Sequence, residues 1–333
     1  MDPNPTASAT GTPGAPHSVA DNLFVGVDIG GTKVAAGLVN ANGDILSQTR
    51  IAMVANGSAA DGLNAILSAI SKTLPSDSRS VHGIGICAPG PLDPRTGVIL
   101  NPPNLPCWRD FPLAAEVLKA YSVSVKVDND ANAAALAEAR WGAAHGYSNV
   151  FYATLGTGIG SGIVFDGKIY HGRTGAAGEG GHVSIDRNGP ICVCGKPGCI
   201  EVLASGTAIA KRARTCISEG RKSLINELAN GNPELITGQT VAQALAADDV
   251  LAREILTECA DMIALWLSNM VDILDPEIIV IGGGAAALYE PFFGSIRECV
   301  PAFAINPRAH EVPIAAARYG ADSGIAGGAA LCT

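Results

Sequence analysis

Apolar residues follow two patterns along the chain. Uninterrupted apolar runs that end in glycine are typical of strands buried on both faces. Such runs occur at 23–30, 82–90, 149–156 and 277–284. A different spacing, at 251, 255, 259, 262, 266 and 270, predicts a soluble helix over 251–274. Further predicted elements are helices over about 59–74, 131–141, 204–247 and 321–330, and a strand over 124–130. Strands that alternate with helices predict an α/β fold.

The first fifty residues of this pattern form a predicted three-stranded meander. Its strands are expected at 23–30, 32–39 and 44–51, and Asn42-Gly43 is typical of the tight turn in a β-hairpin. Such a start fits an antiparallel edge on a mixed sheet. A strand, a glycine turn and a second strand recur over 149–170, so Gly158 matches Gly30. This internal similarity predicts two related α/β domains that face each other.

The composition narrows the class of protein. Hydrophobic residues are 47% and charged residues 16% of 333 residues, which suffices for a folded core. A net charge of −9 does not favour a broad nucleic-acid-binding face, and no apolar run reaches the roughly 20 residues of a membrane helix. Residues 1–21 are rich in Pro, Ser, Thr, Ala and Gly and lack the pattern of a secretory signal. We expect a disordered tail there and a cytoplasmic protein.

Two glycine turns are candidate phosphate-binding sites. In the first, Gly30 and Gly31 let backbone N–H groups approach a phosphate closely. Thr32 and Lys33 add donors, and Asp28 would hold Mg²⁺ through water. The second turn is Gly156-Thr157-Gly158, again directly after a strand. Either turn alone is equally typical of a plain hairpin, but the pair favours phosphate binding from two sides.

A third glycine run, Gly282-Gly283-Gly284, follows the last long apolar strand. Positions 282–287 satisfy the G-x-G-x-x-A pattern of dinucleotide-binding proteins, which normally opens the first βαβ unit and not a late one. The flat glycine surface would suit the adenosine of a nucleotide. A P-loop is excluded, because Ile169 stands where Ser or Thr would hold Mg²⁺ in the spacing that starts at Gly162.

The segment Asp128-Asn129-Asp130-Ala131-Asn132 opens a predicted helix. Asp and Asn are ordinary helix caps, but one cap residue is enough and this segment has several. A carboxylate at a strand–helix junction near a phosphate site suits a base that accepts the proton of a hydroxyl group. In phosphoryl transfer the position of such a base matters more than its basicity.

The strongest signal is a group of one histidine and three cysteines. His182, Cys192, Cys194 and Cys199 match a closed tetrahedral zinc site of the Cys₃His type. Four protein ligands leave no open position, so we expect a structural metal. The other six cysteines are scattered, which argues against a disulfide framework. Glu179 and Glu201 flank the cluster, and the metal would fix both carboxylates where they could accept hydrogen bonds from hydroxyl groups.

In combination these motifs resemble the ROK family of bacterial sugar kinases. The resemblance rests on five segments, in order: DIGGTK (28–33), NDAN (129–132), LGTGIGSG (155–162), GEGGH (178–182) and CVCGKPGCIE (192–201). It implies the actin/hexokinase-like ATPase fold, in which two RNase H-like α/β domains surround a central cleft, with a small zinc-binding insertion. The implied domains are 22–127 with the C-terminal helix 318–333, and a larger one over 128–317 that contains the zinc motif 182–199.

The resemblance also implies an activity. The γ-phosphoryl group of ATP, bound with Mg²⁺, would pass to a hexose hydroxyl, most often the 6-hydroxyl, with Asp130 as base. The residues implied to bind the sugar are Asn104, Asn129, Asp130, Glu179, His182 and Glu201. The residues implied to bind ATP are those of the turns at 30–33 and 156–158, with Asp28, and Gly282, Gly283 and Gly284. His182 would bind zinc and, through its other ring nitrogen, the sugar. A homodimer or homotetramer is expected.

Several alternatives stay open at this point. Glucose is the favoured hexose, with N-acetylglucosamine, N-acetylmannosamine and fructose as rivals. A sugar-responsive repressor would need a basic DNA-binding domain, and only about 21 non-helical residues precede DIGGTK. A nicotinamide dehydrogenase would need an acidic residue about 20 positions after its glycines, and none is convincing. Three positions, Gly180, Cys107 and Asp128, depart from the family pattern, which leaves the sugar pocket's shape open.

Overall fold

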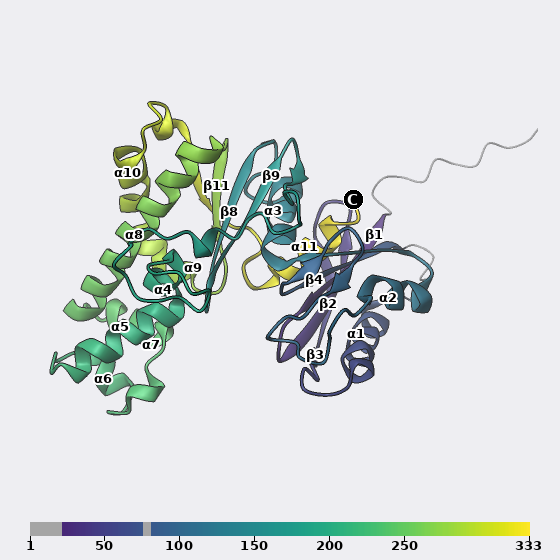
Figure 1. Ribbon diagram of the computed structural model, residues 1–333, viewed down its shortest axis with the longest axis horizontal. Coiled ribbons are helices and arrows are strands. Elements are labelled where there is room, and N and C mark those ends of the chain that lie inside the picture. Colours follow the sequence, from purple (N-terminus) through teal and green to yellow (C-terminus); the bar gives the residue numbers. More distant parts are fainter. Residues whose placement is uncertain (1–21, 76–80) are drawn as a thin grey trace, which may run out of the picture.

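The computed structural model describes residues 22–75 and 81–333. The predicted tail at 1–21 lies outside the described residues. Two lobes lie side by side and are joined where α3 (Asp130–Trp141) packs against α11 (Ser323–Ala330) (Figure 1). The division into domains at residues 127/128 and 317/318 stays a prediction. Strand β7 (Ser124–Asn129), which belongs to the first sheet, continues two residues past the first of these boundaries.

The first lobe is built on a mixed sheet in the order β3-β2-β1-β4-β7. The strands are β1 (Leu23–Ile29), β2 (Lys33–Asn40), β3 (Ile45–Ala52), β4 (Val81–Ala88) and β7 (Ser124–Asn129). β1, β2 and β3 are antiparallel, which confirms the predicted meander, and β4 and β7 run parallel to β1. α1 (Ala59–Thr73) packs against the meander, and α2 (Leu113–Tyr121) packs against β7. A small hairpin joins β5 (Leu92–Asp93) to β6 (Val98–Ile99).

The other face of this sheet is covered by α11. Its backbone lies so close to the strands that a Cβ on Gly26 would overlap the carbonyl oxygen of Ile325, and one on Gly85 would overlap that of Gly328. Glycine is therefore required at both strand positions. Because of this close packing, the C-terminal helix is a full layer of the first lobe.

The second lobe repeats the arrangement with a sheet in the order β10-β9-β8-β11-β12. Its strands are β8 (Val150–Leu155), β9 (Ile159–Phe165), β10 (Lys168–Ile169), β11 (Ile278–Gly282) and β12 (Ile314–Ala316). β8 and β9 are antiparallel, and β11 is parallel to both β8 and β12. The two sheets therefore share one strand order, as the matching glycine turns predict.

Most of the helices lie on the outer side of the second lobe (Figure 1). They are α4 (Ile200–Ala204), α5 (Gly206–Ser218), α6 (Leu224–Leu228), α7 (Gly238–Ala246), α8 (Val250–Leu274), α9 (Ala286–Tyr289) and α10 (Phe293–Phe303). The short 3₁₀ helices are η3 (Gly180–His182), η4 (Pro233–Leu235), η5 (Glu290–Phe292), η6 (Ala309–Glu311) and η7 (Gly320–Asp322). The stripe predicted for 251–274 faces the core, where Trp266 contacts Phe151 edge to face with ring centroids 5.6 Å apart.

One predicted helix was wrong in extent. The segment 204–247 forms three helices and a 3₁₀ turn instead of one helix. Gly220 and Gly231 adopt positive φ, which ends a helix, and Ser223 and Thr237 cap the helices that follow. Among the described residues, no helix is long and apolar enough to cross a membrane.

Candidate functional site

Asn129 supplies the cap of α3, and Asp130 adds to it through one oxygen, because its Oδ1 also accepts from the Ala131 N–H (2.8 Å). The side chain of Asn129 accepts hydrogen bonds from the backbone N–H groups of Ala131 (2.9 Å) and Asn132 (3.3 Å) and so caps α3. Asp130 is an exposed residue, although protein surrounds its carboxylate closely.

Three carboxylates from different elements interact at this place. Burial raises the pKa of Asp130, and the charge of Glu179 raises it further. Burial also raises the pKa of Asp28 to about 6, with a contribution from the charge of Asp130, while Lys33 and Arg50 act in the opposite direction. The structure thus brings together the carboxylates predicted for Mg²⁺, for the base and for the sugar. Their mutual repulsion is of the kind that a cation or a bound hydroxyl relieves.

The first glycine turn lies beside a predicted sugar-binding residue. Its turn closes through a hydrogen bond from the Gly30 N–H to the Lys33 carbonyl (2.9 Å). A Cβ on Gly31 would come within 3.0 Å of the Asn104 carbonyl oxygen. Thr32 and Lys33 are exposed, as is Asn104. These predicted residues therefore lie together at the carboxyl end of β1, next to Asp28.

The second and third glycine turns open onto one cavity of about 650 Å³. Gly156 and Thr157 line it from one side and Gly284 from another. Gly282 and Gly283 do not line it but pack against β8, where a Cβ would overlap the Tyr152 hydroxyl or the Leu155 carbonyl. Their predicted contact with adenosine is therefore reduced to Gly284.

Sequence reasoning missed several residues that line this cavity. Ile236 and Leu288 make part of it apolar, and the polar groups include Thr207 and Lys211. Thr207 also holds the second turn, because its hydroxyl donates to the Thr157 carbonyl (2.8 Å). These residues come from α5, α9 and the segment before α7 and carry no motif. Only a tertiary structure brings them together.

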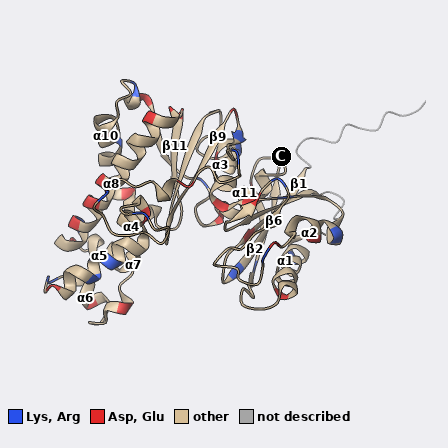
Figure 2. Ribbon diagram, viewed as in Figure 1, with Lys and Arg blue, Asp and Glu red and all other residues tan. Residues whose placement is uncertain are grey.

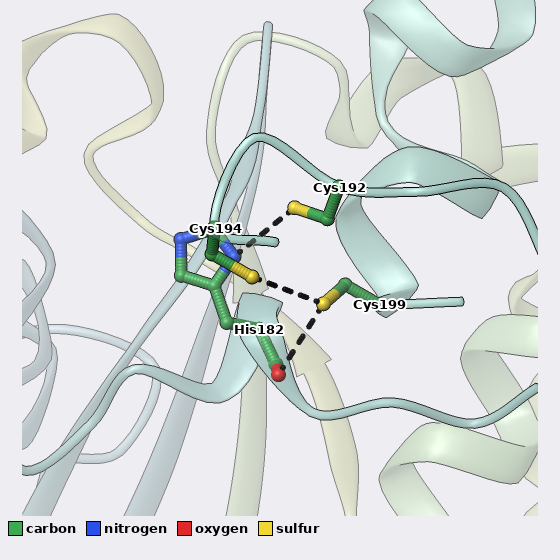
Figure 3. A group of neighbouring side chains, drawn as sticks. All are labelled: His182, Cys192, Cys194 and Cys199. Atoms are coloured by element: carbon green, nitrogen blue, oxygen red, sulfur yellow. Dashed lines mark hydrogen bonds between the residues drawn. The ribbon is translucent and has the colours of Figure 1, made fainter. Parts of the chain in front are cut away.

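The histidine and cysteine cluster forms as predicted. The ligand atoms of His182, Cys192, Cys194 and Cys199 lie within 4.8 Å of one another. The Cys192 Sγ is 3.5 Å from the His182 Nδ1, and the Cys194 Sγ is 3.6 Å from the Cys199 Sγ (Figure 3). Burial and the neighbouring thiols raise the pKa of Cys199 to about 12. Thiols packed this closely fit a cation that binds thiolates, which is the chemistry of Zn²⁺.

Glu201 connects this cluster to the second glycine turn. Its Oε2 accepts a hydrogen bond from the Ile159 N–H (3.1 Å), and its Oε1 lies 3.9 Å from the His182 Nδ1. The side chain occupies the space that a Cβ on Gly158 would take. Glycine at 158 therefore leaves room for the glutamate, and movement of the cluster would move both.

Ser161 supports the segment that carries Glu179. Its hydroxyl donates to the Gly178 carbonyl (2.7 Å) and accepts from the Gly180 N–H (3.1 Å), on either side of Glu179. A Cβ on Gly180 would overlap that hydroxyl, so this departure from the resembled pattern fits the space that Ser161 leaves. Cys107 turns its sulfur toward Gly62 of α1, so this departure affects the packing of the first lobe.

The matching sheets and the carboxylates between their glycine turns define the actin/hexokinase-like ATPase fold. Proteins with this fold form a class in which two such lobes face each other. The chain belongs to the ROK family, whose profile matches residues 24–333.

The comparisons with known proteins favour sugar kinases within that family. The sequence is 36% identical over 309 residues to glucokinase of Thermotoga maritima, which covers 92% of this chain and 96% of the relative. The crystal structure of a ROK family glucokinase from Streptomyces griseus in complex with glucose and AMPPNP has a TM-score of 0.79 and 34% identity, over 93% of this chain and 99% of that one.

Relatives with other names are similar at slightly lower identity. N-acetylmannosamine kinase of Salmonella typhi is 32% identical over 307 residues, or 92% of this chain and 96% of the relative. A putative xylose repressor of Caldicellulosiruptor sp. is also 32% identical, over 88% of this chain but only 73% of the repressor.

In the described part of the chain, Lys and Arg residues lie on both lobes (Figure 2).

Proposed function

We propose that the protein is an ATP-dependent hexose kinase that phosphorylates the 6-hydroxyl of glucose. The observation that carries this proposal is the Asp130 carboxylate, which interacts with the carboxylates of Asp28 and Glu179. Similarity to glucokinases over more than nine-tenths of the chain supports the sugar. A homodimer or homotetramer in the cytoplasm stays a prediction.

Asp130 would act as the base. The sugar O6 would form a bond to the γ-phosphorus while the bond from phosphorus to the bridging oxygen of ADP breaks, and the O6 proton would pass to the Asp130 carboxylate. The Oδ1 of Asp130 accepts from the Ala131 N–H, so Oδ2 would be the oxygen that takes the proton. A raised pKa makes Asp130 a better proton acceptor than an ordinary aspartate.

The metal ions would have separate roles. Mg²⁺ would be held through water by Asp28, whose carboxylate interacts with that of Asp130, and would supply positive charge to the phosphates. Zn²⁺ would be held by His182 and the three cysteines and would only fix the fold. In this arrangement, Nδ1 of His182 faces the cysteines and leaves Nε2 for a sugar hydroxyl (Figure 3).

The sugar and the nucleotide would occupy different sides of Asp130. Glu179 and Glu201 would accept hydrogen bonds from sugar hydroxyls, and Asn104 and Asn129 would complete the pocket. The 650 Å³ cavity would take adenosine, since Ile236 and Leu288 offer an apolar surface and Lys211 a cation near the phosphates. Gly156 and Thr157 line the same cavity, so the phosphates would lead from it toward Asp130.

A coupled spectrophotometric assay with ATP and a panel of hexoses tests the proposal. We expect the highest kcat/KM with glucose, and comparable ADP release without sugar would contradict kinase activity. If only N-acetylated hexoses are phosphorylated, the substrate is an N-acetylated hexose and not glucose, as the name of the N-acetylmannosamine kinase relative suggests. DNA binding that is lost at high salt, without turnover of any sugar, would favour a repressor.

A further inference from the structure

Asp128 is a buried carboxylate that the proposed reaction does not use. Its side chain is 6% exposed and lies at the end of β7, two residues before Asp130. Its Oδ1 accepts hydrogen bonds from the Asn129 N–H (2.7 Å) and from the Asn132 side-chain amide (3.2 Å). Its Oδ2 lies 2.6 Å from Nε2 of His171. Both oxygens of Asp128 are therefore hydrogen-bonded, and these bonds fix the turn that carries Asp130.

His171 approaches Asp128 from the other lobe. It follows β10, the edge strand of the second sheet, whereas β7 is the edge strand of the first. The carbonyl of His171 accepts a hydrogen bond from the N–H of Ala177 (3.2 Å), two residues before Glu179. One residue thus holds the Asp130 turn with its ring and the start of the Glu179 segment with its backbone.

Asp128 is the group that favours an imidazolium at His171, in a lining whose other charged side chains are cations. Asp128 and His171 line a hollow of about 270 Å³ together with Lys126, Arg140 and Lys168, and the end of the described chain at Thr333 also reaches it. Within the described part of the chain, Asp128 supplies the only carboxylate side chain of this lining. The hydrogen bond to Asp128 raises the pKa of His171 although partial burial opposes it. A charge-assisted hydrogen bond of 2.6 Å in a half-buried place is a strong contact.

We propose that His171 is a positioning residue that holds Asp130 and Glu179 in a fixed position relative to each other across the two lobes. It touches neither the sugar nor ATP in the proposed reaction, on which this inference rests. Through Asp128 it sets the Asn129–Asp130 turn, and through its carbonyl it sets the segment that carries Glu179. Loss of the ring releases the turn that carries Asp130. It also removes the contact that anchors the backbone of His171, whose carbonyl holds the segment before Glu179, so the base and one wall of the sugar pocket are affected together. The nucleotide cavity does not contain His171.

The test compares two substitutions at this position. His171→Ala removes the contact and is expected to lower kcat about 10-fold and to raise the KM for sugar several-fold, because small displacements of reacting groups are costly. The KM for ATP is expected to stay within about 2-fold. His171→Gln keeps a side-chain N–H that can donate to Asp128, so it is expected to recover kcat to within about 3-fold. The control is His310→Ala, since His310 is exposed on η6.

The pH dependence separates positioning from a general loss of structure. The imidazolium of His171 strengthens the pair below its raised pKa, and the contact weakens as the pH rises through that pKa. In the wild type the KM for sugar is therefore expected to rise at alkaline pH, and in His171→Gln that rise is expected to disappear. Measurement of the His171 ring titration by NMR, in the protein without sugar, gives the pKa directly.

Two results would overturn the inference. One is a His171→Ala variant with wild-type kcat and sugar KM. The other is an equal loss in the Ala and Gln variants that also raises the KM for ATP. If the wild type phosphorylates no sugar, the proposed function fails, while the NMR titration still tests the pair: a His171 pKa near or below 6.5 would contradict it.

Discussion

At the scale of single residues, Asp130 is the residue on which the proposed chemistry depends most. Asp130→Asn preserves the size of the side chain but removes the proton acceptor. We expect kcat to fall by about 10²–10⁴-fold while the affinity for sugar, measured by calorimetry, changes less than about 5-fold. Turnover within a few-fold of the wild type would show that Asp130 is not the base.

Asp28 allows a prediction about pH and stability. Its pKa is raised by burial from 3.8 to about 6, so the unfolded chain loses this proton before the folded protein does. The free energy of unfolding therefore falls as the pH rises from about 4 to about 6 and stays lower above that range. Asp28→Asn removes this cost.

We expect Asp28→Asn to unfold at higher urea concentration than the wild type at pH 8, by on the order of 1–2 kcal/mol given the partial exposure of the group. The difference should vanish near pH 4. Asp261→Asn, at an exposed position of α8, is the matched control. Equal urea midpoints of Asp28→Asn and the wild type at both pH values would contradict the burial of Asp28. In the activity assay, we expect Asp28→Asn to lose most turnover.

Sequence alone located the residues that belong to contiguous motifs. The four residues of the metal cluster come together as their spacing indicates, and Asp28, Asp130 and Glu179 come close enough to interact. Ser161 lies in the LGTGIGSG segment but was given no role, and His171 escaped notice because a lone histidine carries no pattern. Their importance comes from hydrogen bonds to segments about twenty to forty residues away.

At the scale of elements, the metal cluster ties α4 to the second glycine turn. Cys194→Ser should remove bound zinc, measured with a chromogenic chelator, and raise the KM for sugar roughly 10-fold because Glu201 and His182 lose their support. Cys216→Ser, in α5 and outside the cluster, is the control. Unchanged sugar affinity in a zinc-free variant would separate the metal from sugar binding.

The packing of α11 on β1 gives a prediction about stability. Gly26→Ala places a methyl group on the Ile325 carbonyl, so we expect a loss of about 2–4 kcal/mol in the free energy of unfolding, measured by urea titration. Gly294→Ala is the control, because a Cβ in that part of α10 has no atom within 4 Å. That change should raise stability by up to about 1 kcal/mol.

Elements were predictable where the pattern was long. The stripe of α8 and the apolar strands β1, β4, β8 and β11 lie within one or two residues of their predicted bounds. α2, α10 and β12 were not predicted. β12 has only three residues, and Pro301 inside α10 is a residue that ordinarily argues against a helix.

At the scale of the whole molecule, the two lobes are expected to close when sugar binds. Closure would keep water from the γ-phosphate and bring the glycine turns of the two sheets toward each other. Small-angle X-ray scattering should show a smaller radius of gyration with glucose than without it. An unchanged radius together with normal turnover would indicate a site that is already closed.

The position of α11 has a consequence for synthesis on the ribosome. The strands β1 and β4 emerge early, but the helix that covers one of their faces is made only at residues 323–330. Until then, the apolar surface of the first sheet lacks that layer while the second lobe has nearly all of its own segments. The half that is translated first should therefore mature last, and nascent chains stalled before residue 323 should expose this surface to chaperones.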